Sequence, residues 1–172
     1  MIYSYEEIDG LFEKEKIEII IANGEPKIRE KLFNKVRKEN LNLGKLIDPS
    51  AVISPSSKIK DGTIITPLCS IQANAEINEN VLVNTGSIIG HDILVGKNSV
   101  VSSFVNIGGS SIIGEKVFLG MGCMIKENLK IGSSTIIGMG SFVHRSVGGQ
   151  LIVMGNPARP IKKNEKEKIF RK

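Results

Sequence analysis

An aliphatic residue recurs at every sixth position over more than half of this chain. A helix would place such residues about 3.6 positions apart, and a single strand would place them two apart. A fixed short period instead indicates a solenoid, in which each unit buries its apolar residue by stacking on the next. The row consists of Ile47, Ile53, Ile59, Ile65, Ile71, Ile77, Val83, Ile89, Val95, Val101, Ile107, Ile113, Leu119, Ile125, Ile131, Ile137 and Val143.

A second column, four residues after the first, carries mostly small side chains. Large and small inward residues thus alternate, as the interior of a narrow β-tube requires. Glycine often follows the aliphatic residue and suits a tight corner, and the many β-branched residues favour strands over helix. We therefore predict an all-β parallel β-helix built from short strands. The second column includes Ala51, Ser57, Thr63, Cys69, Ala75, Ser87, Ser99, Ser111, Cys123, Thr135 and Ser141.

The first 46 residues lack the repeat and have the pattern of a small α/β fragment. The run from Glu18 to Ala22 suits a short strand, and Asn23, Gly24 and Pro26 mark a turn and the start of an amphipathic helix. The fragment either caps the open end of the β-helix, whose strand edge needs protection, or is the remnant of a sugar-nucleotide site. We divide the chain into a truncated α/β cap at 1–46, the β-helix at 47–148, and a closing turn with a basic tail at 149–172.

Composition limits the compartments in which the protein is expected and the partners that it is expected to bind. The chain contains no run of 18 apolar residues, and its acidic N-terminus lacks a signal-peptide core, so we expect a cytoplasmic protein without a membrane span. Cys69 and Cys123 both fall in the inward column, which indicates core thiols rather than a disulfide or a metal site. The net charge is +5, but two tyrosines and no tryptophan give nucleic-acid binding little support.

Two histidines are the candidates for acid–base chemistry. His91 lies two residues past the inward Ile89, so its ring is expected to point outward from a corner, with Asp92 next to it. A carboxylate can hold a histidine in one tautomer and make it a better base near neutral pH. If a coil has 18 residues, Gly109 lies directly over His91 and leaves room for a cofactor, although an ordinary corner glycine explains it equally well. His144 is taken as a surface residue.

The segment from about residue 17 to residue 163 resembles the sialic-acid O-acetyltransferase and amino-sugar N-acetyltransferase family of hexapeptide-repeat acyltransferases. The resemblance rests on the stretch VNTGSIIGHDILVG, on the pair Gly108–Gly109, and on the closing VMGNPARPIKK. It implies a left-handed β-helix with three sides per coil. It also implies a homotrimer, with an acetyl-CoA cleft between neighbouring protomers. No metal is expected, because the sequence has no Cys/His ligand cluster.

The resemblance assigns roles to particular residues of this chain. It implies that His91 is the general base, that Asp92 raises the basicity of its ring, and that Asn84 lies near the acceptor. Positions lining the acetyl-CoA cleft correspond to Gly109, Met121, Met139 and the turn at Gly155. Lys162 and Lys163 are candidate partners for the phosphates of CoA.

Two departures from the family pattern affect the substrate. A second histidine that family members often carry is replaced here by Val100, which removes a polar contact to the cofactor. The glycine-rich nucleotide loop of the family's N-terminal domain has no counterpart before Ile17, so the resemblance does not extend to recognition of a UDP-sugar.

The leading hypothesis is an acetyl-CoA-dependent acetyltransferase that acetylates an amine or hydroxyl of a bacterial surface-sugar precursor. Transfer is expected to be direct, because neither inward cysteine can act as a nucleophile. One alternative is an acyltransferase with a non-sugar acceptor, and another is a non-catalytic β-helix scaffold. A zinc enzyme of the γ-carbonic-anhydrase type would need three histidine ligands, and the chain has only two histidines.

Overall fold

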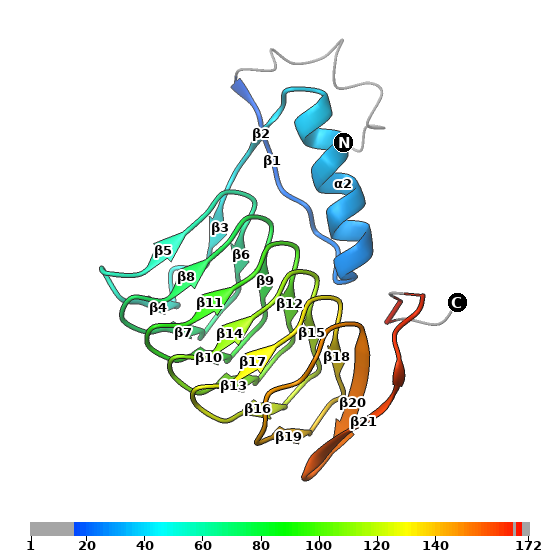
Figure 1. Ribbon diagram of the computed structural model, residues 1–172. Coiled ribbons are helices and arrows are strands. Elements are labelled where there is room, and N and C mark those ends of the chain that lie inside the picture. The colour runs from blue at the N-terminus through cyan, green and yellow to red at the C-terminus, as the bar shows by residue number, and fades with distance from the viewer. Residues whose placement is uncertain (1–15, 167, 170–172) are drawn as a thin grey trace.

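The computed structural model describes residues 16–166, 168 and 169, and these form a three-sided, left-handed parallel β-helix with a small N-terminal α/β unit beside it (Figure 1). Each coil has 18 residues, because Ile88 and Ile89 pair in parallel with Asn106 and Ile107 of the next coil. Every strand from β3 to β19 has two residues, and its second residue is the aliphatic position of the repeat. The period-six row therefore predicted these strands residue by residue.

The strands form three sides, numbered here in chain order. The first side contains β3 (Leu46–Ile47), β6 (Ile64–Ile65), β9 (Leu82–Val83), β12 (Val100–Val101), β15 (Phe118–Leu119) and β18 (Ile136–Ile137). The second side contains β4 (Val52–Ile53), β7 (Ser70–Ile71), β10 (Ile88–Ile89), β13 (Asn106–Ile107), β16 (Met124–Ile125) and β19 (Phe142–Val143). The third side contains β5 (Lys58–Ile59), β8 (Glu76–Ile77), β11 (Leu94–Val95), β14 (Ile112–Ile113) and β17 (Lys130–Ile131).

Three corners join these sides, and each takes four residues per coil. The first corner, between the first and second sides, includes residues 84–87, 102–105, 120–123 and 138–141. The second corner, between the second and third sides, includes residues 90–93, 108–111, 126–129 and 144–147. The third corner includes residues 60–63, 78–81, 96–99 and 114–117. The corner on which a side chain lies thus depends only on its place within the 18-residue coil.

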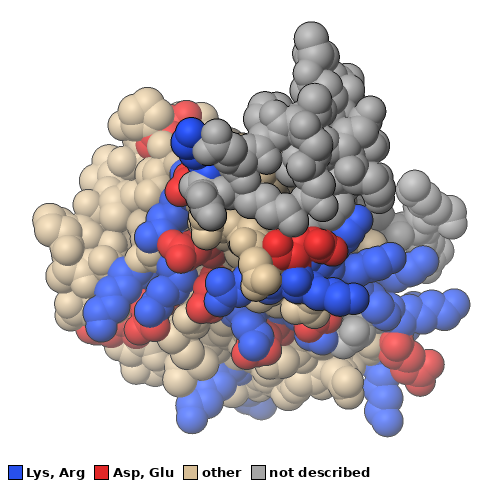
Figure 2. Space-filling view, turned by 90° about the horizontal axis from the view of Figure 1, so that it is seen from above, with Lys and Arg blue, Asp and Glu red and all other residues tan. Residues whose placement is uncertain are grey.

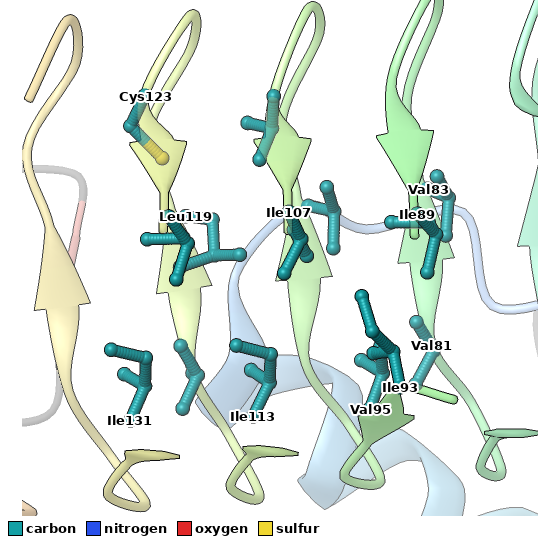
Figure 3. Close-up of a cluster of buried hydrophobic side chains, with 14 of the residues drawn as sticks. Val81, Val83, Ile89, Ile93, Val95, Ile107, Ile113, Leu119, Cys123 and Ile131 are labelled. Carbon is teal, nitrogen blue, oxygen red and sulfur yellow. The ribbon is translucent and has the colours of Figure 1, made fainter. Parts of the chain in front are cut away.

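The interior is a single column of stacked aliphatic side chains. Figure 3 shows Ile89 and Ile107 of the second side pointing into this column, as do Val95 and Ile113 of the third side. The small inward residues link the coils through hydrogen bonds. The buried Ser87 hydroxyl donates to the Ser102 carbonyl at 2.8 Å and accepts from the Val105 N–H at 3.2 Å. The inward polar groups are therefore satisfied without water, and successive coils are fixed in register.

The N-terminal unit is a short parallel β–α–β arrangement. β1 (Glu18–Ile19) pairs with β2 (Asn42–Leu43), and α2 (Pro26–Lys38) connects them. Its own small core consists of Ile21, Val36 and Leu41. Figure 1 shows α2 running lengthwise beside the first side of the β-helix.

Arg29 attaches α2 to the third corner. Its side chain is fully buried, and its guanidinium donates to the Asn80 carbonyl at 2.9 Å and to the Asn80 side-chain oxygen at 2.7 Å. Leu46 and Ile47 of the first coil stay 53% and 39% exposed beside this unit, so the division of the chain into an N-terminal cap and a β-helix stays a prediction. The helix covers a side, and the outward Val100 of that side is 1% exposed.

The C-terminal end is closed by a hairpin. β20 (Leu151–Gly155) adds to the first side next to β18, and β21 (Ala158–Lys163) pairs with it antiparallel. The closing segment thus contains two strands where the sequence predicted a turn. Val153 of β20 is fully buried and covers the last coil.

Charged side chains of both signs lie on the face of the molecule that is seen from above (Figure 2). In the view from above, basic and acidic side chains are interleaved over the same part of the surface (Figure 2). The net charge of +5 therefore does not form a single-signed surface on this face. None of the helices in the described part of the chain is both long and apolar enough to span a membrane.

Candidate functional site

A histidine–carboxylate pair lies on the second corner. The His91 Nδ1 and the Asp92 Oδ2 are 2.7 Å apart, and both side chains are more than half exposed. Asp92 adopts the left-handed backbone conformation with φ of 56°, which Asp tolerates better than most residues and which turns its carboxylate back towards the ring. The two neighbours in sequence therefore meet, although successive residues of an extended chain would point apart.

Asp92 is itself held in place by the preceding coil. The Asn74 side-chain amide donates to the Asp92 Oδ1 at 3.0 Å. The hydrogen bond from the His91 ring, together with that from Asn74, lowers the pKa of the Asp92 carboxyl below its ordinary value. The ionised carboxylate accepts the Nδ1–H of His91, and this leaves the lone pair of the ring on Nε2.

Gly109 provides the space that the ring occupies. A Cβ atom at Gly109 would lie 2.5 Å from His91 Nε2 and 2.6 Å from its Cε1, so no side chain fits there while the ring stays in place. The expected stacking of Gly109 over His91 is therefore observed. Its N–H makes no hydrogen bond with another described residue, so a backbone donor lies beside Nε2.

The other predicted site residues lie on the first corner, a full side of the prism away. Asn84, Met121 and Met139 follow strands of the first side, and Gly155 is the last residue of β20 on that side. Met121 and Met139 are 56% and 76% exposed, and the Asn84 side chain makes no hydrogen bond within the described part of the chain. Asn84 and His91 are separated by most of one side, about 20 Å at the rise of a strand. One chain alone does not bring the two groups together.

A cavity of about 250 Å³ lies at the C-terminal end, between the last second corner and the β20–β21 hairpin. Its lining includes His144, Arg145 and Arg159. His144 is half-buried, and its Nδ1 is buried without a partner in the described structure, so the interpretation of His144 as a plain surface residue is wrong. Arg145 could have been identified from the sequence, because it lies 54 residues, or three coils, after His91 at the same corner position.

Neither cysteine has the surroundings of a nucleophile. Both thiols are buried in the β-helix core. Burial raises the pKa of Cys123 to about 12 and raises that of Cys69 above its ordinary value. Both stay protonated near neutral pH, and the described residues contain no group of three or more His, Cys, Asp or Glu side chains that could hold a metal ion.

The known proteins to which this chain is similar are bacterial hexapeptide transferases and acetyltransferases. Residues 110–145 match the family described as bacterial transferase hexapeptide (six repeats). PerB from Caulobacter crescentus, in a crystal structure with CoA and GDP-perosamine, is 30% identical and superimposes with a TM-score of 0.83, over 84% of this chain and 70% of PerB. A variant of perosamine N-acetyltransferase from the same organism, again with CoA and GDP-perosamine, is 29% identical with a TM-score of 0.84, over 87% of this chain and 71% of that chain.

A third similar structure comes from another organism. The acetyltransferase domain of PglB from Neisseria gonorrhoeae, in complex with acetyl coenzyme A, is 28% identical and has a TM-score of 0.85. The match covers 88% of this chain and 74% of the PglB domain. Each of these three matches therefore covers more than four fifths of this chain.

Proposed function

Because this chain belongs to the hexapeptide-repeat family of acetyl-CoA-dependent sugar acetyltransferases, we propose that it acetylates an amine on a nucleotide-linked amino sugar, with His91 as the general base. PerB binds CoA and GDP-perosamine, which favours an amine over a hydroxyl and a nucleotide sugar over a free one. The product would be a precursor of a bacterial surface sugar. The enzyme would act in the cytoplasm, in line with two unpaired buried thiols.

The hydrogen bond between His91 and Asp92 is the observation that carries this proposal. It directs the Nδ1–H of His91 into a carboxylate and leaves Nε2 unprotonated beside a backbone N–H. A base needs such a lone pair, and a developing oxyanion needs such a donor. Asp92 acts on the ring and does not touch the substrate, so its role is to position and polarise the base.

The reaction then proceeds by direct transfer. The amine nitrogen of the acceptor forms a bond with the thioester carbonyl carbon, while His91 Nε2 takes a proton from that nitrogen. The thioester oxygen becomes negative and accepts a hydrogen bond from the Gly109 N–H. Collapse of this intermediate breaks the carbon–sulfur bond, and the proton on His91 passes to the sulfur of the departing CoA. The high pKa values of Cys69 and Cys123 argue against an acyl-cysteine intermediate.

A homotrimer would complete the site. If three prisms present their second sides to a common axis, the second corner of one protomer meets the first corner of the next. His91 would then lie opposite Asn84, Met121 and Met139 of its neighbour. The second side supports this arrangement, since its outward side chains include the exposed Val52, Ile88 and Met124. The first side is already covered, as the buried outward residues Ile64 and Val100 indicate.

The donor would extend from His91 towards the C-terminal coils. Gly108 and Gly109 leave a groove next to the ring, and Met121 and Met139 would contact the pantetheine arm across the interface. Arg145 lies three coils beyond His91, about 15 Å away at the spacing of stacked strands. The cavity that it lines with Arg159 and His144 suits the phosphates of CoA, and the exposed Lys162 and Lys163 of β21 lie on the neighbouring hairpin.

Release of free CoA in the presence of an acceptor panel tests the proposal. The panel contains GDP-perosamine, a UDP-linked 4-amino sugar and free glucosamine. We expect the wild-type protein to acetylate a nucleotide-linked amine, and His91→Ala to reduce kcat at least 100-fold because a positioned base supplies about 10²–10⁴ in rate. Acetyl-CoA should still raise the Tm of His91→Ala, which shows that the variant is folded. Near-full activity of His91→Ala would exclude His91 as the base.

A further inference from the structure

The most unusual side chain on the first corner is Phe104. Twelve non-glycine residues in the described part of the chain have a left-handed backbone, and ten of them are polar. Leu68 and Phe104 are the exceptions, with φ of 61° and 58°. A bulky residue is disfavoured in this conformation, and the Phe104 side chain gains little from burial because it is 63% exposed. A residue held in such a conformation without a packing benefit suggests a role in function.

The ring of Phe104 folds back onto the preceding coil. A Cβ atom at Gly86 would lie 2.7 Å from Phe104 Cε1, so the ring covers the glycine one coil earlier. Gly86 lies two residues after Asn84 in the same corner, and the ring therefore lies on the N-terminal side of Phe104, away from Met121 and Met139. This arrangement repeats that of the His91 ring over Gly109, with the direction along the axis reversed.

The ring and His91 lie at nearly the same height along the prism. Gly86 and His91 are five residues apart in one coil, which at about 4.8 Å per coil corresponds to roughly 1–2 Å along the axis. Rotation about a three-fold axis parallel to the β-helix preserves this height. In the proposed trimer, the Phe104 ring of one protomer therefore faces the His91 ring of the next, on the side opposite the donor groove.

We propose that Phe104 is an acceptor-binding residue, contributed across the protomer interface, whose ring packs against the C–H face of the acceptor's sugar ring. This inference rests on the proposed function. A sugar ring presents an apolar face and a rim of polar groups, and a site that binds it needs an aromatic surface beside a hydrogen-bonding group. Phe104 supplies the surface, and the Asn84 carboxamide next to it has no partner within the described chain. The aromatic wall would orient the amine towards His91 Nε2.

Steady-state kinetics with matched variants separates this role from a structural one. The acceptor is the member of the panel above that the wild-type protein acetylates fastest. We expect Phe104→Ala to raise the KM for this acceptor about tenfold, to change the KM for acetyl-CoA less than twofold, and to leave the trimer intact. Phe104→Trp should restore the acceptor KM to within about threefold of wild type, because it keeps an aromatic face.

Leu68→Ala is the matched control. Leu68 occupies the same corner position two coils earlier, has nearly the same φ and is 68% exposed, but it lies about 6 Å from the height of His91 and about 10 Å from Phe104 along the axis. Both KM values should stay within twofold of wild type. An unchanged acceptor KM in Phe104→Ala, a raised KM for acetyl-CoA instead, or loss of the trimer would each overturn the inference. A wild-type protein that acetylates no member of the panel would overturn the proposed function, and the inference with it.

Co-expression of Phe104→Ala with His91→Ala tests the contribution across the interface. Each parent is defective, but a site that takes His91 from one variant and Phe104 from the other has both side chains. In randomly mixed trimers this applies to about a quarter of the sites. We expect about a quarter of wild-type activity at an acceptor concentration well below the raised KM. Activity no greater than the sum of the two parents would show that His91 and Phe104 do not share a site between protomers.

Discussion

The position of the His91 ring depends both on hydrogen bonding with its neighbours and on the missing side chain at Gly109. Asp92 accepts the Nδ1–H, and Asn74 fixes Asp92 from the coil before. Gly109 then provides the volume into which the ring extends from the opposite side. The imidazole is thus held by hydrogen bonds on one edge and by the absence of a Cβ atom on the other. A base positioned in this way needs little reorganisation when the substrate binds.

Gly109→Ala tests the importance of this space. The new methyl group would lie 2.5 Å from Nε2, so the ring must rotate away from Asp92 and from the acceptor. The backbone at Gly109 does not have a positive φ, and alanine is therefore tolerated there. We expect kcat to fall at least tenfold, as for a misplaced base, while the Tm changes by less than about 3 °C.

Gly24→Ala is the control for this substitution, because a Cβ atom at Gly24 meets nothing within 4 Å. It should leave kcat unchanged. Full activity in Gly109→Ala would mean that the ring does not work from the position described.

The surroundings of a residue follow from the sequence where its place in the 18-residue coil decides them. The stacking of Gly109 on His91 followed from the count alone. The contact of His91 with Asp92 depends on a left-handed φ that the spacing does not reveal. Phe104 was missed, although a signal was present: it is apolar at a corner position where most coils carry Asn, Asp, Ser or Gly.

Among the elements, the β-helix strands and the N-terminal unit differ in how far the sequence determines them. The inward aliphatic row defines β3 to β19, because a shift by one residue would turn every aliphatic side chain outward. The helix α2 was also predicted, but its location was not, since attachment to the third corner depends on single side chains. Arg29 is the main one, and a lone arginine in an amphipathic helix has no feature that distinguishes it from a solvated one.

Arg29→Met tests the attachment of α2. The guanidinium donates to the carbonyl groups of Ile21, Asn23 and Asn80 and, more weakly at 3.5 Å, to that of Gly62. Burial lowers its pKa to about 10, so it stays charged near neutral pH. Removing it leaves several buried carbonyl groups without a donor. We expect the free energy of unfolding to fall by about 3 kcal/mol. Hydrogen exchange should increase first in residues 16–45.

Arg37→Met, on the exposed surface of the same helix, is the matched control and should cost less than about 0.5 kcal/mol. Equal destabilisation by the two variants would mean that Arg29 does not anchor the unit.

In the whole molecule, the described contacts between coils lie within one chain, but the candidate site is divided between two corners. Coil-to-coil hydrogen bonds and the aliphatic column link each coil of the prism to its neighbours. His91 and Asn84 nevertheless lie at opposite edges of the second side. Periodicity predicts the prism because each coil contacts only its neighbours. It does not predict how prisms associate, since the outward residues on the sides do not repeat.

Ile88→Glu tests whether the second side is the interface between protomers. Ile88 is outward on that side, next to the His91 corner, and is 38% exposed in the single chain. Three copies of a glutamate would meet near the axis, where burial without a partner is costly. We expect the wild-type protein to sediment as three 18.7 kDa chains, and Ile88→Glu to sediment as one chain with at least a 100-fold loss of kcat/KM. The circular dichroism of the β-helix should remain, because the core of each prism is untouched.

Leu94→Glu, in the same coil, separates loss of assembly from a general effect of charge on an apolar patch. Leu94 is 37% exposed, also faces outward from a two-residue strand, and lies on the third side just after the His91 corner. It should leave both the trimer and the activity in place. Dissociation by Leu94→Glu and not by Ile88→Glu would mean that the third side faces the axis, and His91 would then meet the third corner of its neighbour, which α2 already occupies. A wild-type protein that is a fully active monomer would instead remove the need for any site shared between chains.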